Sequence, residues 1–209
     1  MEQTQQKLPI EFYTRNVHVI AKDLLGKIFV RKFNSIYLTG KIVEVEAYDG
    51  KIDEASHSFN GMTKRNEVMF NGGGKLYVYF TYGMHFCANV VTGPPGDRTA
   101  VLIRAIDPLD NIEQLAVNRF AKKDISKKEF TNLSNGPGKI CKAFAIGRSD
   151  NGTSLTGSNI FILDAPAISK RQIITSTRIG IKKSVDLPWR YSIKDNPFVS
   201  VNPLKRNNK

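Results

Sequence analysis

Two carboxylates are the first candidates for chemistry in this sequence. Glu44 and Glu46 lie two residues apart in IVEVEAY, a segment with the β-branched and aromatic composition of a strand. Residues two apart on a strand share a face, and the simplest interpretation is a half-exposed strand whose polar face meets water. However, Tyr48 and a long loop carrying His57 follow directly. A carboxylate held beside aromatic surface at a strand end could instead position a water molecule as a general base.

The segment LYVYFTYGMHF (76–86) concentrates aromatic residues. Its alternation places Tyr77 and Tyr79 on one face of a strand, with Tyr82 and Met84 at the tip of a hairpin. Aromatic residues on a sheet usually belong to the core. In a basic protein, tyrosines so close to a hairpin tip also suit stacking on bases or wedging into a duplex.

One arginine and one glycine-containing segment could meet an anion, whereas a second glycine-rich segment could not. Arg104 lies in an otherwise apolar strand, where an unpaired charge is costly, so it should contact a carboxylate or a phosphate. Glu46 is the natural partner. NGPGK (135–139) opens a predicted helix whose free N–H groups could hold a phosphate, although a plain loop-to-helix junction is an equally good interpretation. NGGGK (71–75) precedes a strand rather than a helix, which predicts a turn.

These residues must be positioned by a sheet, because strand patterns dominate the sequence. A helix is predicted over 14–26, with Thr14 as its N-cap and Gly26 as its stop, and His18 falls on its surface side. Further helices are predicted over 110–120 and 136–146. Strands are predicted at 27–32, 36–48, 75–82, 85–91, 99–106, 159–164, 178–183 and 197–201.

This order of elements predicts an α+β fold. We expect a single domain over 1–209, with a central antiparallel or mixed curved sheet, flanking helices and a protruding β-hairpin. The ends, 1–10 and 204–209, are expected to be flexible, and KKDISKK (122–128) is expected to form a solvated loop.

Composition narrows the class of protein. The 209 residues carry a net charge of +12, which suggests a polyanionic partner, either nucleic acid or an anionic membrane surface. No apolar run is long enough to span a membrane, and the first residues do not resemble a signal peptide. Two cysteines, Cys87 and Cys141, form no disulfide framework, which predicts an intracellular protein. Zinc-ligand spacings are missing, so zinc fingers and zinc-dependent deaminases are disfavoured.

Four segments in order resemble the alkyladenine (3-methyladenine) DNA glycosylase family: 44–58, 65–91, 100–109 and 135–146. The resemblance covers nearly the whole chain. It implies a single-domain fold with an antiparallel core sheet. It also implies excision of alkylated or deaminated purines, such as 3-methyladenine, 7-methylguanine and hypoxanthine, from duplex DNA, leaving an abasic site during base excision repair.

The resemblance also implies roles for individual residues. Glu46 matches the general base, while Arg104 and the carbonyl of Ile179 match the groups that help to hold the attacking water. The pocket for the flipped base matches Tyr48, His57, Tyr79 and Asn89, and Asn89 disfavours the 2-amino group of normal guanine. Tyr82 matches the side chain that fills the gap in the duplex. Contacts to the DNA backbone are expected from Thr63, Lys64, Arg65 and Met84.

Two departures from the family pattern make these backbone contacts less secure than the pocket. The loop between His57 and Asn66 is one residue shorter than in mammalian members, and His85 replaces an aromatic residue common there. The family chemistry requires no metal or other cofactor, and no lysine is placed as a nucleophile. We therefore expect a monofunctional enzyme without strand cleavage, acting as a monomer on double-stranded DNA, in the bacterial cytoplasm or in a eukaryotic nucleus.

Two other function classes remain open at this stage. A helix-hairpin-helix glycosylase or DNA-binding module could be built on NGPGKICKAFAI (135–146), but that class requires a mainly helical chain and a catalytic aspartate beyond the hairpin. A non-enzymatic binder of double-stranded nucleic acid could use the same basic surface and tyrosines. Glu46 separates general-base catalysis from non-enzymatic binding, because only the enzyme needs its carboxylate.

Overall fold

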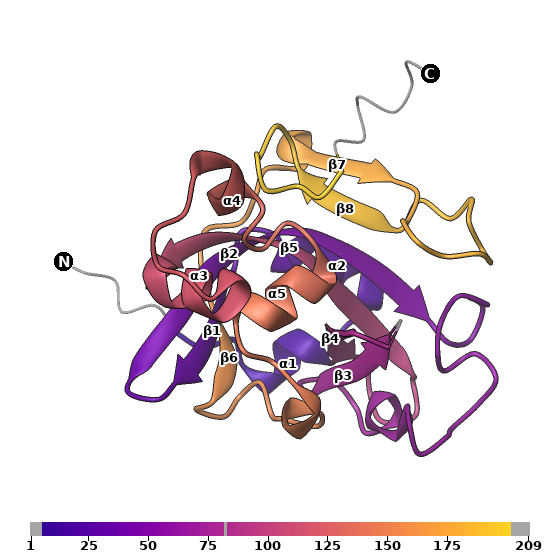
Figure 1. Ribbon diagram of the computed structural model, residues 1–209. Coiled ribbons are helices and arrows are strands. Elements are labelled where there is room, and N and C mark those ends of the chain that lie inside the picture. The colour runs from indigo at the N-terminus through magenta and orange to yellow at the C-terminus, as the bar shows by residue number, and fades with distance from the viewer. Residues whose placement is uncertain (1–5, 82, 202–209) are drawn as a thin grey trace.

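The computed structural model describes residues 6–81 and 83–201, and it is organised around one antiparallel sheet (Figure 1). Six strands follow the order β3-β4-β5-β2-β1-β6, and β8 pairs with both β2 and β7. The strands are β1 (Ile28–Phe33), β2 (Ile36–Asp49), β3 (Leu76–Thr81), β4 (His85–Thr92), β5 (Thr99–Asp110), β6 (Ile160–Leu163), β7 (Ile173–Ser176) and β8 (Arg190–Ile193). The predicted α+β class is confirmed, and every described strand pair is antiparallel.

Strand β2 is the centre of the sheet. Its first residues pair with β1, the part from Thr39 to Asp49 pairs with β5, and Glu44–Glu46 pair with β8. Six consecutive residues, 42–47, are buried. A strand that is buried on both faces needs partners for any polar side chain that it carries, and this strand carries two carboxylates.

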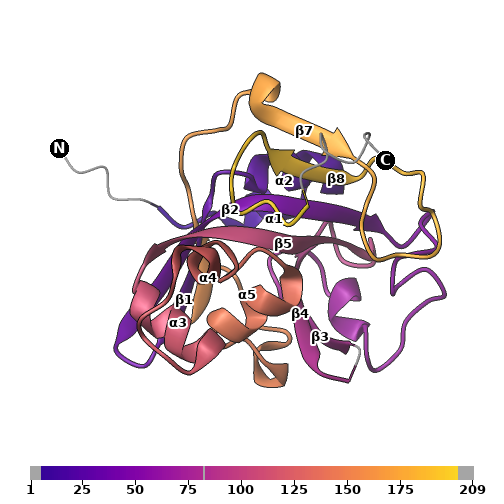
Figure 2. The same ribbon diagram turned by 45° about the horizontal axis from the view of Figure 1, so that its top comes forward.

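Helices cover both sides of the sheet (Figure 2). On one side, α2 (Val17–Leu24) packs against β2 and β5; on the other, α5 (Pro137–Ala143) packs against β4 and β5. The remaining helices are α1 (Ile10–Tyr13), α3 (Ile112–Phe120) and α4 (Lys127–Thr131), with 3₁₀ turns at η1 (Glu67–Phe70), η2 (Arg148–Asp150) and η3 (Lys170–Gln172). The main apolar core joins α2 and α5 to the sheet between them.

Two connections shape the region that later forms the site. The hairpin of β3 and β4 turns through Gly83, whose φ of +67° suits glycine. Residues 50–75 form a long loop interrupted only by η1. Its NGGGK segment is the predicted turn, since Gly72 and Gly74 both have positive φ.

Several sequence predictions were wrong in detail. Residues 178–183 and 197–201 are not strands; β7 and β8 precede and separate them. The first long helix begins after Asn16, whose side chain accepts a hydrogen bond from the N–H of His18. Thr14 instead follows α1. Within the predicted loop 122–128, α4 begins at Lys127, capped by a reciprocal hydrogen-bonded pair of Ser126 and Glu129.

Candidate active site

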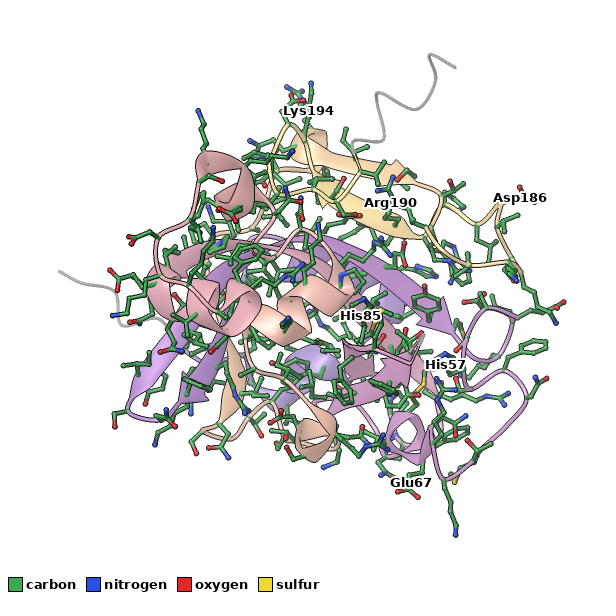
Figure 3. All side chains as sticks on the ribbon, viewed as in Figure 1. His57, Glu67, His85, Asp186, Arg190 and Lys194 are labelled. Atoms are coloured by element: carbon green, nitrogen blue, oxygen red, sulfur yellow. The ribbon has the colours of Figure 1, made fainter. Side chains whose placement is uncertain are left out.

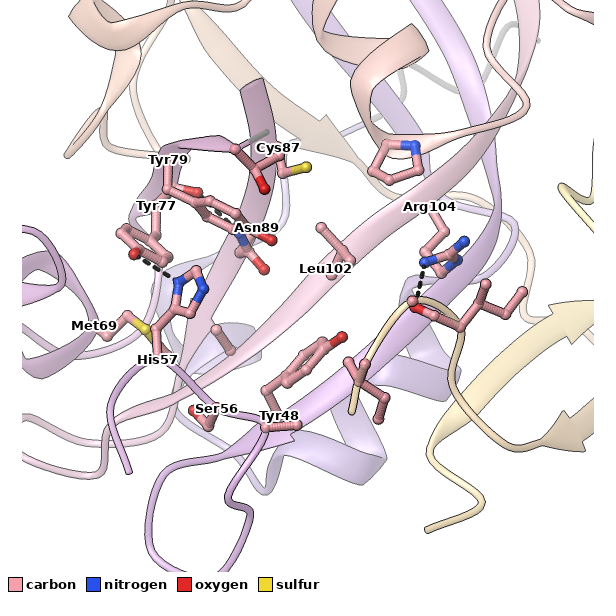
Figure 4. Close-up of a pocket in the computed structure, with 17 residues that line it drawn as sticks. Tyr48, Ser56, His57, Met69, Tyr77, Tyr79, Cys87, Asn89, Leu102 and Arg104 are labelled. Atoms are coloured by element: carbon pink, nitrogen blue, oxygen red, sulfur yellow. Dashed lines mark hydrogen bonds between the residues drawn. The ribbon is translucent and has the colours of Figure 1, made fainter. Parts of the chain in front are cut away.

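A cavity of about 270 Å³ opens where the C-terminal part of β2, the β3–β4 hairpin and two loops meet (Figure 4). Its volume is at the small end for ligand pockets. In the view of Figure 4, His57 and Tyr79 lie on one side, Tyr48 and Arg104 lie on the other, and Leu102 lies between them. Asn89 and Ile179 also line it. The structure thus brings together around one cavity the six residues that were predicted to form the base pocket or to hold the water: Tyr48, His57, Tyr79, Asn89, Arg104 and Ile179.

Glu46 lies in the wall behind this cavity and is fully buried. Its Oε2 accepts a hydrogen bond of 2.8 Å from the Tyr48 hydroxyl. Its Oε1 accepts one of 2.8 Å from the backbone N–H of Ile179 and lies 3.3 Å from Nη1 of Arg104. The interpretation of Glu44 and Glu46 as a water-facing polar face is therefore wrong, because neither carboxylate is exposed.

A register irregularity directs Arg104 toward both carboxylates. The pairing of β2 with β5 shifts between Glu44 and Val45, so Arg104 stands between two paired positions rather than opposite one residue. Bulges often re-aim a side chain beside a site. Nε of Arg104 lies 3.2 Å from Oε1 of Glu44, while Nη1 faces Glu46. The predicted Arg104–Glu46 contact is confirmed, and Glu44 is a second partner.

Ionisation of these groups follows from their neighbours. Burial disfavours the charge of Arg104, but the carboxylates of Glu46 and Glu44 outweigh it and raise the pKa of the guanidinium. Burial, followed by the charge of Glu46, raises the pKa of Tyr48 well above its ordinary value. Tyr48 therefore stays protonated, and its hydroxyl donates a hydrogen bond to the Glu46 carboxylate.

Ile179 contributes through its backbone. Its N–H donates to Glu46, and its carbonyl oxygen lies 3.5 Å from Nη1 of Arg104. One carboxylate oxygen, one guanidinium nitrogen and one carbonyl oxygen consequently converge beside the cavity. Such a convergence can hold a small polar molecule that both donates and accepts hydrogen bonds, and water has that property.

The opposite wall is aromatic. The His57 ring meets Tyr79 edge to face at 4.4 Å between centroids, and its Nδ1 lies 3.0 Å from the Tyr77 hydroxyl. Burial raises the pKa of Tyr77 to about 12 and the pKa of Tyr79 still further. His57 as a whole residue is exposed, but its imidazole is buried against these rings. This burial lowers the pKa of His57 to about 4, and the charge of Arg65 has a smaller effect in the same direction. His57 is thus neutral near pH 7.

The depressed pKa of His57 predicts a pH-dependent stability. Between pH 6.5, the ordinary value, and about 4, the unfolded chain binds more protons at this position than the folded chain does. The contribution of the neutral His57 imidazole to the free energy of unfolding is complete above pH 6.5, and it is lost as the pH falls toward 4. We expect the melting temperature of His57→Gln to fall less over this window than that of the wild type, as measured by differential scanning calorimetry.

His85 provides the matched control for this titration. It lies on the β3–β4 hairpin beside α5, with an exposed side chain (Figure 3). His85→Gln should follow the wild-type pH profile of the melting temperature. An unchanged profile in His57→Gln would contradict the assignment of a neutral, desolvated imidazole to the pocket.

Two small side chains complete the pocket floor. Asn89 is buried and its Nδ2 donates to the carbonyl of Tyr77 at 3.2 Å, which fixes the amide against the wall. Cys87 also lines the cavity, beside Tyr79. Burial raises the pKa of the Cys87 thiol, so it stays protonated and behaves as a small apolar group.

The residues predicted to contact the DNA backbone lie outside the cavity. Thr63, Lys64, Arg65 and Met84 are exposed, and Met84 retains 69% of its surface. Arg65 borders the pocket, since its guanidinium lies 5.7 Å from the centroid of Tyr79. Tyr82, the predicted intercalating residue, lies outside the described residues.

Sequence reasoning missed two contributors to the site, and it also missed the partial burial of His18, which does not line the cavity. Tyr77 was placed on the same face as Tyr79 but not in the pocket, and it holds His57. Arg178 stacks on Tyr48, with 4.5 Å from the guanidinium carbon to the ring centroid. His18 was expected on the surface, yet it is half-buried and packs edge-on against Trp189. Only the charge of Arg178, inside RIGI, was a signal that the sequence offered.

Two classes of site receive no support within 6–81 and 83–201. No group of three or more His, Cys, Asp or Glu side chains in these ranges is arranged to hold a metal ion. In the same ranges, no helix has the length and apolar character needed to cross a membrane.

The sequence of this chain is similar to those of a known protein family. The profile of the family described as Methylpurine-DNA glycosylase (MPG) matches residues 11–197. A relative from Alkaliphilus oremlandii is 44% identical over 200 residues, which cover 93% of this chain and 98% of the relative. One from Carboxydothermus hydrogenoformans is 47% identical over 194 residues, covering 92% and 98%. One from Clostridium botulinum is 46% identical over 197 residues, covering 91% and 96%. All three are named "Putative 3-methyladenine DNA glycosylase".

Proposed function

The chain belongs to the methylpurine-DNA glycosylase family, and from this premise we propose that it hydrolyses the N-glycosidic bond of alkylated or deaminated purines in duplex DNA. The substrates we propose are 3-methyladenine, 7-methylguanine and hypoxanthine, and the product is an abasic site for base excision repair. The observation that carries the proposal is Glu46, a buried carboxylate held at the wall of a small aromatic pocket by Tyr48, Arg104 and Ile179.

The reaction needs one activated water. A water held by the Ile179 carbonyl and Nη1 of Arg104 attacks C1′ of the deoxyribose while Glu46 accepts its proton. The bond between C1′ and the purine nitrogen breaks, and the base leaves with the electron pair. An N-alkylated purine already carries positive charge and leaves as a neutral molecule, whereas hypoxanthine leaves as an anion unless it is protonated.

The aromatic walls suit the extruded base. Enzymes that act on a base in duplex DNA rotate it out of the stack into a pocket, and we propose that Tyr48 faces one side of the base while His57 and Tyr79 face the other. Electron-rich rings attract a cationic purine. Because burial keeps Tyr48, Tyr77 and Tyr79 protonated and His57 neutral, the pocket wall itself changes little in charge near pH 7.

Affinity for DNA is proposed to come from the surface rather than from the pocket. The net charge of +12 provides phosphate contacts that do not depend on sequence. Thr63, Lys64, Arg65 and Met84 border the pocket side of the molecule, and Tyr82 is proposed to enter the gap left by the extruded base. A scanning enzyme requires such non-specific binding.

Phosphate contacts predict a steep salt dependence. The dissociation constant for a lesion-free duplex, measured by fluorescence anisotropy, should rise strongly between 50 and 200 mM salt. Lys64→Ala should weaken binding to all sequences and reduce the slope of log affinity against log salt by about one.

Lys32 serves as the control for Lys64. It is exposed on β1, at the opposite end of the sheet from the β3–β4 hairpin (Figure 1). Lys32→Ala should leave both affinity and slope near the wild-type values. Equal effects of the two substitutions would contradict a DNA contact localised on the pocket side.

The test of the proposed function is a glycosylase assay over duplexes that each contain one damaged purine. We expect release of the free base and an abasic product that breaks only after alkali treatment. Binding without release of any base would favour a non-enzymatic binder of duplex DNA. The helix-hairpin-helix alternative is not supported, since a sheet and not a helical array forms the framework around Glu46.

A further inference from the structure

Arg178, the residue before Ile179, makes a buried bidentate ion pair with Asp53. Its Nη1 and Nη2 lie 2.5 and 2.8 Å from the two carboxylate oxygens, and both side chains are fully buried. Burying two charges costs free energy that apolar packing would not. The pair is therefore a weak source of stability, and its importance depends on which other groups it fixes.

The guanidinium of Arg178 contacts the active-site strand directly. Nη1 donates to the carbonyl of Ala47 at 3.0 Å, and the guanidinium carbon lies 4.5 Å from the centroid of the Tyr48 ring and 5.3 Å from that of Trp189. Nη2 also donates to the carbonyl of Ser184 at 3.2 Å. One side chain thus supports the ring of Tyr48 and ties it to the loop that carries Ile179.

Asp53 fixes the other loop. Its N–H donates to the carbonyl of Asp49 at 2.9 Å, and its Oδ1 accepts from the N–H of Ala55 at 3.0 Å. Its carbonyl accepts from the N–H of Ser56, the residue before His57. The turn that leads from β2 to His57 is consequently built around the same carboxylate that binds Arg178.

We propose that the Arg178–Asp53 pair is a positioning device, which sets Tyr48, His57 and Ile179 at their working distances across the pocket. Neither side chain contacts the reacting atoms; the pair acts through the two loops and the Tyr48 ring. This inference rests on the proposed glycosylase function. Small misplacements of catalytic groups cost large factors in rate, so the effect should appear in the chemical step.

The test uses Asp53→Asn, which keeps the shape but removes the charge, together with Arg178→Met and Arg178→Lys. Single-turnover excision from a hypoxanthine duplex, with enzyme in excess, should slow by about ten- to a hundredfold in the first two. Binding to a duplex with an abasic-site analogue should stay close to wild type, because no base then occupies the pocket. Arg178→Lys keeps the charge without the bidentate geometry and should recover part of the rate.

The matched control is the Arg31–Asp150 pair, which joins β1 to η2 at 2.5 Å and lines no part of the pocket. Asp150→Asn should lower the melting temperature but leave the excision rate of the folded protein unchanged. Wild-type rates in folded Asp53→Asn and Arg178→Lys, or a parallel loss of rate and affinity, would overturn the inference. If Asp53→Asn and Arg178→Met do not fold, the result for Arg178→Lys decides. Wild-type inactivity on every lesion would instead overturn the proposed function.

Discussion

Replacement of Glu46 by Gln should reduce single-turnover excision of hypoxanthine or 3-methyladenine by roughly a hundredfold or more, the usual contribution of a general base. Glutamine has the same shape, but its single amide oxygen can replace only one of the two carboxylate oxygens, of which Oε2 accepts from Tyr48 and Oε1 accepts from the N–H of Ile179. It cannot accept the proton of the attacking water. The measurement is a rate at saturating enzyme on a duplex with one lesion.

Two control measurements accompany the Glu46→Gln experiment. Affinity for a duplex that contains an abasic-site analogue should persist, because the phosphate contacts lie elsewhere. Glu113→Gln, an exposed carboxylate replaced in the same way on α3, should excise at the wild-type rate. Unchanged excision by Glu46→Gln would show that this carboxylate is not the general base of the reaction.

The central strands could be predicted from sequence because their composition and their turns agree. β1 to β5 lie close to the expected ranges, and the turns at Asn34 and Gly83 have the positive φ that such residues tolerate. The errors at 178–183 and 197–201 have one physical cause. Both segments have strand-like composition, but their backbone N–H and carbonyl groups form hydrogen bonds with buried side chains instead of with a neighbouring strand.

The two C-terminal segments show this directly. The N–H and carbonyl of Ile179 face Glu46 and Arg104, and the N–H of Ser200 donates to Glu44 at 2.6 Å. The carbonyl of Val201 accepts from Arg190. Backbone groups that are hydrogen-bonded to buried side chains cannot also pair with a neighbouring strand. No local sequence pattern reveals these long-range hydrogen bonds.

The same reason limits prediction of the site. The types and spacing of Glu46, Tyr48 and Arg104 were sufficient to suggest a carboxylate, an aromatic neighbour and a cation that meet. Their burial could not be inferred, because it depends on contacts with Ile179, 133 residues from Glu46 along the chain. Alternation on a strand describes which residues share a face; it does not say what covers that face.

Replacement of Glu44 by Gln should give the largest loss of stability among single carboxylate substitutions. Oε1 of this fully buried carboxylate accepts from Nη1 of Arg190 at 3.0 Å, from Nε of Arg104 at 3.2 Å and from the Ser200 hydroxyl at 2.9 Å. Glutamine would leave Arg190, 1% exposed, with neutral oxygens as its only hydrogen-bond acceptors, because the amide carries no charge. Breaking a buried ion pair costs about 3–5 kcal/mol, which for a chain of this size lowers the melting temperature by roughly 6–20 °C.

Asp23→Asn is the control that separates burial from charge in the Glu44 experiment. Asp23 pairs with Arg15 at 2.8 Å, but the two side chains are 44% and 39% exposed, and exposed pairs contribute at most about 1 kcal/mol. Calorimetry or urea unfolding should therefore show a small shift for Asp23→Asn and a large one for Glu44→Gln. Equal small shifts would mean that Arg190 finds compensation from water or from neighbouring carbonyls, and that Glu44 serves to orient Arg104 rather than to stabilise the fold.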